Sequence, residues 1–232
     1  MAKYLIHASP SRMWYVTDYL IPSMTDQGIS RDDISIWNDA NGNGCLKSTM
    51  ASFASVDRND SGIWHLQDDV IIAPDFKMKT EELDQGLVCG FCYDSAEKWR
   101  TEARGYTKGK NVWFSFPCIR IPNQLARDVA DWFFKRVIPE DLHLDLVVTG
   151  KHDDTLFVKY VESFRPDDLI LNYSPGLVEH IDYMLGGSLV NKNRKRKVAH
   201  GLYSYERFDK GINELRERLM ADRKLVILAN DY

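Results

Sequence analysis

Two adjacent carboxylates, Asp68 and Asp69, lie between a short apolar segment and a second one. Neighbouring ionised carboxylates repel each other unless a cation neutralises them. Mn²⁺ or Mg²⁺ does this well, because such ions take oxygen ligands and keep positions for phosphate oxygens. The pair therefore predicts a metal site that handles a nucleotide diphosphate, although Asp-Asp pairs also occur in plain solvated turns. We expect the Asp69 carboxylate to be exposed, so that Asp69→Asn leaves the fold intact.

The elements that position this pair are predicted from the first half of the chain. Apolar segments over 4–7, 34–37 and 63–66 have the length of strands, and helical spacing covers 11–24 and 45–56 between them. This alternation predicts the α/β class, with a Rossmann-like, mostly parallel sheet flanked by helices. Ligands of such sheets bind at the carboxyl ends of the strands. The carboxylate pair follows the third strand, where a binding site is expected.

The second half of the chain is less regular. Strands are predicted over 86–92 and 112–121, and the polar stretch 93–110 between them predicts a long loop, which is either a lid over a ligand or a solvated excursion. Residues 142–148 are apolar without a regular period. We expect one domain over residues 1–232 with an irregular C-terminal portion. Further helices are predicted over 123–137, 153–163 and 206–222.

The formal net charge is −4, which argues against a generally basic nucleic-acid binder. The charge is uneven, however, because residues 191–197 hold five cations and no acid. This run predicts either a patch that faces a polyanion or a solvated basic loop. No apolar run approaches the ~20 residues of a bilayer span, so we expect no membrane span and a cytoplasmic location. The candidate acceptor-binding residues are Arg194, Lys195, Arg196 and Lys197.

Three stretches together resemble glycosyltransferases of the GT-A fold, and most of all the small family that includes lipooligosaccharide galactosyltransferases. Leu66–Val70 is similar to the acidic motif of that family, although Gln67 stands where the motif usually has an acid. Lys151–Leu156 is similar to the acidic helix start beneath the acceptor. Pro175–Ile181, with a Gly-Ser pair shortly after it, is similar to the segment whose histidine lies near the metal and diphosphate.

This resemblance implies a nucleotide-diphosphate sugar as donor and Mn²⁺ or Mg²⁺ as cofactor. Asp69, with Asp68 beside it, would hold the ion that bridges the diphosphate. His180 would be a further metal ligand, the alternative being a hydrogen-bonded histidine near the core. Asp153 or Asp154 would take the acceptor proton, while the other caps the start of its helix.

The resemblance also gives a role to the loops after the first two strands. The loop after the first strand receives the base and ribose in GT-A enzymes, so His7 and Ser9 are expected to contact the nucleotide. Arg12 is expected to pair with the diphosphate, unless it is an ordinary exposed helical arginine. Asp39, after the second strand, is expected to contact the nucleoside or to serve as a turn residue.

Taken together, the sequence predicts transfer of a sugar from a nucleotide-diphosphate sugar to an acceptor hydroxyl. Residues of about 1–92 would bind the nucleotide sugar, and about 93–232 would form the acceptor side. The size and the basic run resemble phage enzymes that glycosylate hydroxymethylated bases in DNA, which would place the protein in the host cytoplasm. An anionic cell-surface glycan or a lipid-linked acceptor is the alternative. A Mg²⁺-dependent nucleotidyltransferase and a non-enzymatic binding module are the other classes, and the sugar, the nucleotide, the stereochemistry and the oligomeric state stay open.

Overall fold

A seven-stranded sheet forms the centre of the computed structural model, which describes residues 2–91, 103–108, 116–150, 152–174, 176–187 and 206–225. The strand order is β2-β1-β3-β7-β5-β8-β6, and β4 and β9 form a separate two-stranded sheet. The strands of the large sheet are β1 (Lys3–Ala8), β2 (Ile34–Asn38), β3 (Ile63–Gln67), β5 (Leu87–Cys89), β6 (Ala103–Lys108), β7 (Cys118–Ile121) and β8 (Leu169–Ser174). The small sheet pairs β4 (Val70–Ile72) with β9 (Val178–His180).

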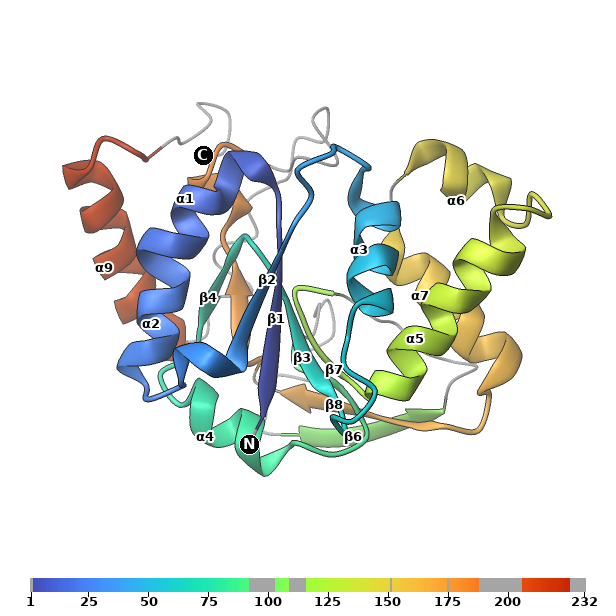
Figure 1. The fold of residues 1–232 in the computed structure, drawn as a ribbon. Helices are drawn as coiled ribbons and strands as arrows, with labels where there is room; N and C mark the ends of the chain where they lie inside the picture. The colour runs from blue at the N-terminus through green and yellow to red at the C-terminus, as the bar shows by residue number, and fades with distance from the viewer. Residues whose placement is uncertain are drawn as a thin grey trace.

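Helices cover both faces of the large sheet. Figure 1 shows α1, α2 and α9 on one side of it and α3, α5, α6 and α7 on the other. The first helical stretch is made of η1 (Pro10–Arg12), α1 (Met13–Tyr15), η2 (Val16–Leu20) and α2 (Ile21–Asp26). The other helical elements are η3 (Arg31–Asp33), α3 (Cys45–Ala54), α4 (Phe76–Glu82), α5 (Asn123–Trp132), η6 (Phe133–Val137), α6 (Leu144–Thr149), α7 (Asp153–Phe164), η7 (Asp182–Met184) and α9 (Glu206–Ala221).

The cores on the two faces are distinct, because successive side chains of a strand point to opposite faces. In β1, Tyr4 and Ile6 pack into the core beneath α1, α2 and α9, whereas Leu5 packs into the core beneath α3, α5 and α7. All three side chains are buried. The sequence of a strand that is covered on both faces is a continuous apolar run, without alternation of apolar and polar residues. The central residues of β1, Tyr4 to Ile6, form such a run.

The arrangement of β1, β2 and β3 creates the place for a site. β1 lies between the other two and is parallel to both. The chain therefore leaves β1 toward β2 and later returns to its other side, and the carboxyl ends of β1 and β3 flank a topological switch point, where open α/β sheets bind ligands. The predicted α/β class is confirmed. In the rest of the sheet β5 and β8 are parallel, while β7 and β6 run antiparallel to their neighbours.

Two expectations about secondary structure are wrong. The polar stretch 93–110 is not all loop, because residues 103–108 form β6, which ends the strand order of the described sheet and pairs with β8. An edge strand needs no apolar alternation, and charged residues there prevent pairing with other chains. Residues 142–148 are not irregular either, because α6 covers most of them and the left-handed His143 and Gly150 bound it. Among the described residues, no helix is long and apolar enough to cross a bilayer.

Candidate functional site

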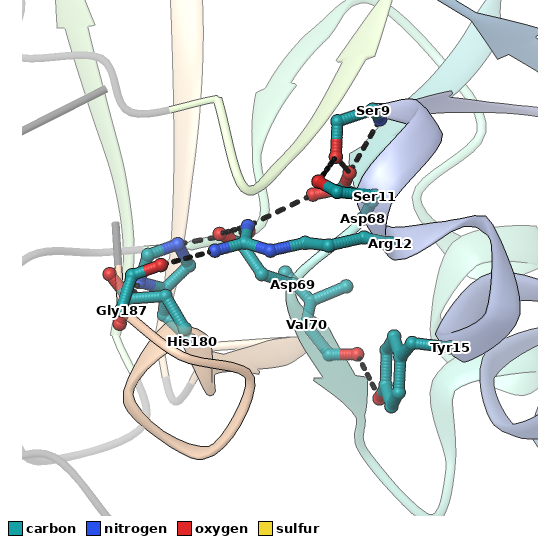
Figure 2. Close-up of polar contacts among 10 residues, drawn as sticks. Ser9, Ser11, Arg12, Tyr15, Asp68, Asp69, Val70, His180 and Gly187 are labelled. Carbon is teal, nitrogen blue, oxygen red and sulfur yellow. Dashed lines mark hydrogen bonds and ion pairs between the residues drawn. The ribbon is translucent and has the colours of Figure 1, made fainter. Parts of the chain in front are cut away.

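The site begins where the loops after β1 and β3 meet. Ser9, one residue beyond β1, donates its backbone N–H to Asp68 Oδ2 at 2.6 Å and its hydroxyl to the same oxygen at 2.8 Å. Asp68 is the first residue after β3. These two hydrogen bonds join the carboxyl ends of neighbouring parallel strands, as the position of both residues in the sequence predicts (Figure 2).

Arg12 crosses this junction as a buried cation. Its Nη1 donates to Asp68 Oδ1 at 3.1 Å and also to Asp69 Oδ2, and its Nη2 donates to the carbonyl oxygen of Gly187 at 2.6 Å (Figure 2). The residue is only 4% exposed, so it is not an ordinary exposed helical arginine. The expectation of an exposed Asp69 is also wrong, because Asp69 is 7% exposed, and the neighbouring Asp68 is 6% exposed. The nearby Arg12 guanidinium is one source of the neutralising charge that the pair requires.

Asp69 also faces a histidine and a third carboxylate. His180 Nε2 lies 3.0 Å from Asp69 Oδ1, and His180 Nδ1 lies 3.4 Å from Asp182 Oδ1. The small sheet creates this contact, because His180 pairs with Val70, the residue after Asp69, and Ile181 donates its N–H to the Asp69 carbonyl at 2.8 Å. The predicted meeting of Asp69 and His180 is thus present in the structure.

The charges of these groups depend on one another. Burial raises the pKa of Asp69, but the His180 and Arg12 charges outweigh burial and hold that pKa well below its usual value. Burial and the adjacent Asp69 charge raise the pKa of Asp68, against the effects of Arg12 and Ser9. Burial disfavours the charged form of Arg12, yet Asp69 and Asp68 raise its pKa. Asp69 is therefore the carboxylate that the structure holds ionised.

Asp69, His180 and Asp182 fit a divalent ion. One ligand atom from each of them lies within 4.8 Å of the others. Carboxylate oxygens suit both Mg²⁺ and Mn²⁺, whereas an imidazole favours a transition metal, so the donor set fits Mn²⁺ better than Mg²⁺. The sequence prediction missed Asp182. Its position two residues after His180, at the start of η7, is the signal that could have found it.

A second polar group, which we call the hydroxyl relay, lies on the α3 and α7 side of the sheet. His7 Nε2 is 2.8 Å from Ser48 Oγ, and His7 Nδ1 is 3.2 Å from Thr49 Oγ1. Thr49 in turn donates its hydroxyl to Asp153 Oδ2 at 2.7 Å. Both ring nitrogens of His7 are thus occupied within the protein. The relay consists of His7, Ser48, Thr49 and Asp153, and the two hydroxyl residues were not predicted.

The two candidate bases differ in their surroundings. Asp153 is 4% exposed, and burial together with the Asp154 charge raises its pKa. Asp154 is half-buried, burial raises its pKa, and its Oδ1 accepts the N–H of Thr155 at 2.6 Å. Both lie in the first turn of α7. Asp154 thus satisfies an exposed helical N–H, as a residue at a helix start is expected to do.

The remaining candidates lie outside these two groups. Asp39 accepts the N–H groups of Asn43 at 2.9 Å and Gly44 at 3.1 Å, so its carboxylate organises the loop before α3. Its own N–H donates to the Ala8 carbonyl at 3.0 Å, which places this loop beside the end of β1. The basic run with Arg194, Lys195, Arg196 and Lys197 lies outside the described residues.

Comparison with known proteins adds little to this geometry. No protein-family model matches the chain, and a search of curated proteins gives no match. Among solved structures, HddC from Yersinia pseudotuberculosis is similar at 13% identity and a TM-score of 0.32, over 55% of this chain and 80% of that one. A likeness of this size carries no conclusion about function, which has to be argued from the site itself.

Proposed function

We propose that the chain is a metal-dependent glycosyltransferase, which moves a sugar from a nucleotide-diphosphate sugar to an acceptor hydroxyl. One observation carries the proposal: ligand atoms of Asp69, His180 and Asp182 converge within 4.8 Å beside the buried cation Arg12. The group lies at the carboxyl ends of β1 and β3. A switch point with a metal site and an arginine suits a ligand with several phosphate oxygens.

The residues divide the work of holding the donor. Asp69, His180 and Asp182 would hold the Mn²⁺ or Mg²⁺. The ion would neutralise the charge that develops on the diphosphate leaving group. Arg12 presents a planar guanidinium with several N–H donors, a geometry that matches phosphate oxygens. Ser9 and Asp68 fix the loop after β1 in its place through two hydrogen bonds. The nucleoside would then lie toward the loop held by Asp39.

Removal of the acceptor proton needs a base that the acceptor can reach. Asp154 is half-buried with a raised pKa, and both features suit a general base. Asp153 is buried and already accepts the Thr49 hydroxyl. We therefore assign the proton transfer to Asp154, and we assign to Asp153 the role of holding the hydroxyl relay. Asp154→Asn should abolish transfer to the acceptor while slow hydrolysis of the donor survives.

The proposed acceptor is a hydroxymethylated base in DNA. Its support is the basic run at 191–197, because five cations exceed what one diphosphate with a bound metal requires. Neutralising Arg194, Lys195, Arg196 and Lys197 should weaken DNA binding and flatten its salt dependence. Binding of modified DNA, unmodified DNA and an anionic glycan should be compared over a range of salt. Equal salt dependence before and after neutralisation would remove the support for DNA.

The decisive assay of the activity is a screen of nucleotide sugars with Mn²⁺. A donor that binds only the native state raises the melting temperature, and the positive donor is then tested for sugar transfer or slow hydrolysis. Release of pyrophosphate from nucleoside triphosphates would indicate a nucleotidyltransferase instead. If neither reaction occurs with any bound nucleotide, the chain is a binding module and the proposed activity is wrong.

A further inference from the structure

The arginine and the candidate metal ligands share one carboxylate. Arg12 Nη1 donates to Oδ2 of Asp69, whereas His180 Nε2 approaches Oδ1 of the same group at 3.0 Å. A divalent ion held by Asp69, His180 and Asp182 would therefore be a close neighbour of the guanidinium. Two cations would then compete for the charge of Asp69.

We propose that Arg12 is an internal counter-cation that disfavours binding of the metal alone and makes metal binding depend on the diphosphate of the donor. The inference rests on the metal site of the proposed function, and it adds a positive coupling between metal and donor. Each would bind more tightly when the other is present, because each relieves a repulsion that the other would meet.

Burial makes the repulsion between the two cations effective. The Arg12 side chain is 5% exposed, and the side chains of Asp68 and Asp69 are 9% and 10% exposed. Charges at the protein surface are weakened by water and salt, but buried charges are screened much less. The Arg12 charge cannot be removed by deprotonation either, because a guanidinium stays protonated in proteins. The approaching ion therefore meets a fixed positive charge.

A diphosphate removes this repulsion by placing anionic oxygens between the two cations. Arg12 is prepared for such a contact, because its buried Nε has no hydrogen-bond partner among the residues that the structure describes. A buried unpaired N–H is unfavourable, and a phosphate oxygen that accepts it removes the penalty. Guanidinium N–H groups also bind phosphate oxygens in pairs. With the diphosphate bound, Arg12 and the metal ion would both bind its oxygens and would no longer compete for the charge of Asp69.

The test measures Mn²⁺ binding by calorimetry, with and without inorganic pyrophosphate as the diphosphate probe. The Mn²⁺–pyrophosphate equilibrium in the buffer is measured separately. The wild-type protein should bind Mn²⁺ at least about tenfold more tightly when pyrophosphate is present. Arg12→Gln should bind Mn²⁺ alone about tenfold more tightly than the wild type, and its gain from pyrophosphate should shrink by a similar factor. Arg12→Lys keeps the charge and should bind Mn²⁺ alone as weakly as the wild type.

Arg120→Gln is the matched control. Arg120 is 2% exposed and pairs with Asp84 at 2.8 Å, so its loss also removes a buried cation from an ion pair, but in a different part of the sheet. This variant should lose stability and keep wild-type Mn²⁺ binding. Equal Mn²⁺ affinity in Arg12→Gln and the wild type would overturn the inference. If Arg12→Gln fails to fold, wild-type Mn²⁺ affinity that pyrophosphate leaves unchanged would overturn it as well.

The outcomes separate this inference from the proposed function. Absence of Mn²⁺ binding under all conditions would refute the metal site, and the inference with it. Mn²⁺ binding with the same affinity in the Arg12 variants and the wild type would refute the inference but not the metal site. The predicted coupling without sugar transfer from any donor would uphold the inference and refute the glycosyltransferase.

Discussion

Asp69 and Asp153 are buried carboxylates in two polar groups near the carboxyl ends of the parallel strands, and their surroundings shift their pKa values in opposite directions. In the charged cluster, Arg12 and His180 hold the pKa of Asp69 well below its usual value, so the carboxylate stays ionised. In the hydroxyl relay, Thr49 donates its hydroxyl to Asp153, and burial raises the pKa of that group. The charged cluster consists of Arg12, Asp68, Asp69, His180 and Asp182.

This difference indicates which group can hold a cation. An ionised carboxylate beside an imidazole and another carboxylate is a ligand set for a divalent ion. Burial raises the pKa of Asp153, so this carboxyl group is less suited to hold a cation, and the relay links β1, α3 and α7 through hydrogen bonds. Substitutions that replace a carboxylate with its neutral amide, in the charged cluster or in the hydroxyl relay, test this difference.

The largest effect on metal binding is expected for Asp69→Asn. The amide carries no charge, so Arg12 keeps only Asp68 as an anionic partner in the cluster. Removing one member of a buried ion pair costs about 3 kcal/mol of unfolding free energy, and loss of the ligand should weaken Mn²⁺ binding by about 100-fold or more. Urea denaturation and Mn²⁺ titration measure the two effects. Asp131→Asn, in an exposed pair with Lys135, is the control and should change neither quantity measurably.

His180→Ala should separate binding from stability. The variant removes one of three candidate ligands, so Mn²⁺ affinity should fall by about 10- to 100-fold. The side chain is 13% exposed and truncation leaves the small sheet paired, so the loss of unfolding free energy should be about 1–2 kcal/mol. Calorimetry and thermal denaturation give both values. A large fall in melting temperature with unchanged Mn²⁺ affinity would make His180 a structural residue.

A third effect depends on pH and concerns His65, which lies against the relay. The centroid of its ring lies 5.9 Å from that of the His7 ring and 5.4 Å from that of the Phe53 ring. Burial lowers the pKa of His65 to about 3, and His7 adds a smaller effect in the same direction. Between pH 6.5 and about 3, His65 is therefore protonated in the unfolded chain but stays neutral in the folded protein. Stability should fall by about 1.4 kcal/mol per pH unit between these two values because of this residue alone.

His65→Leu isolates the effect of this residue. Both proteins are unfolded with urea at several pH values from 7 to 4, and the difference between their unfolding free energies is followed. The carboxylates contribute to both curves and cancel in this difference. The variant should lose less stability than the wild type as the pH falls, and parallel curves would contradict the lowered pKa of His65.

The smallest effect is expected for Asp153→Asn. The amide oxygen can still accept the Thr49 hydroxyl, and burial, which raises the pKa of Asp153, already opposes the charged form that the amide removes. Unfolding free energy should change by less than about 1 kcal/mol, and donor hydrolysis should stay near the wild-type rate. Denaturation and hydrolysis assays check both. A normal fold with abolished sugar transfer would instead make Asp153 the base, in place of Asp154.

Much of this site could be predicted from the sequence. Asp68 and Asp69 were found because they follow an apolar segment in a β-α-β-α-β pattern, and such a pattern fixes the edge of the sheet at which they lie. The contact between Asp69 and His180 was implied by a resemblance alone. The structure gives its physical cause, which is the pairing of β4 with β9. No local pattern predicts such a pairing between segments about a hundred residues apart.

Other features could not be predicted, because they depend on tertiary contacts. Arg12 looks like a surface residue in the sequence, and its burial follows from the packing of the loops around Asp68 and Gly187. Ser48 and Thr49 lie in a helix without any motif, and their partners come from the distant elements β1, β2 and α7. The edge strand β6 was missed because its polar sequence resembles that of a loop.

The central claim is that the charged cluster holds a divalent ion for a nucleotide-diphosphate sugar. Its most direct test is calorimetric titration of Mn²⁺, in the presence of the donor found by the screen, into the wild type and Asp69→Asn. The account predicts saturable binding of one Mn²⁺ to the wild type and none at the same concentrations to the variant. Equal binding to both proteins, or donor turnover that persists in a chelator, would contradict it.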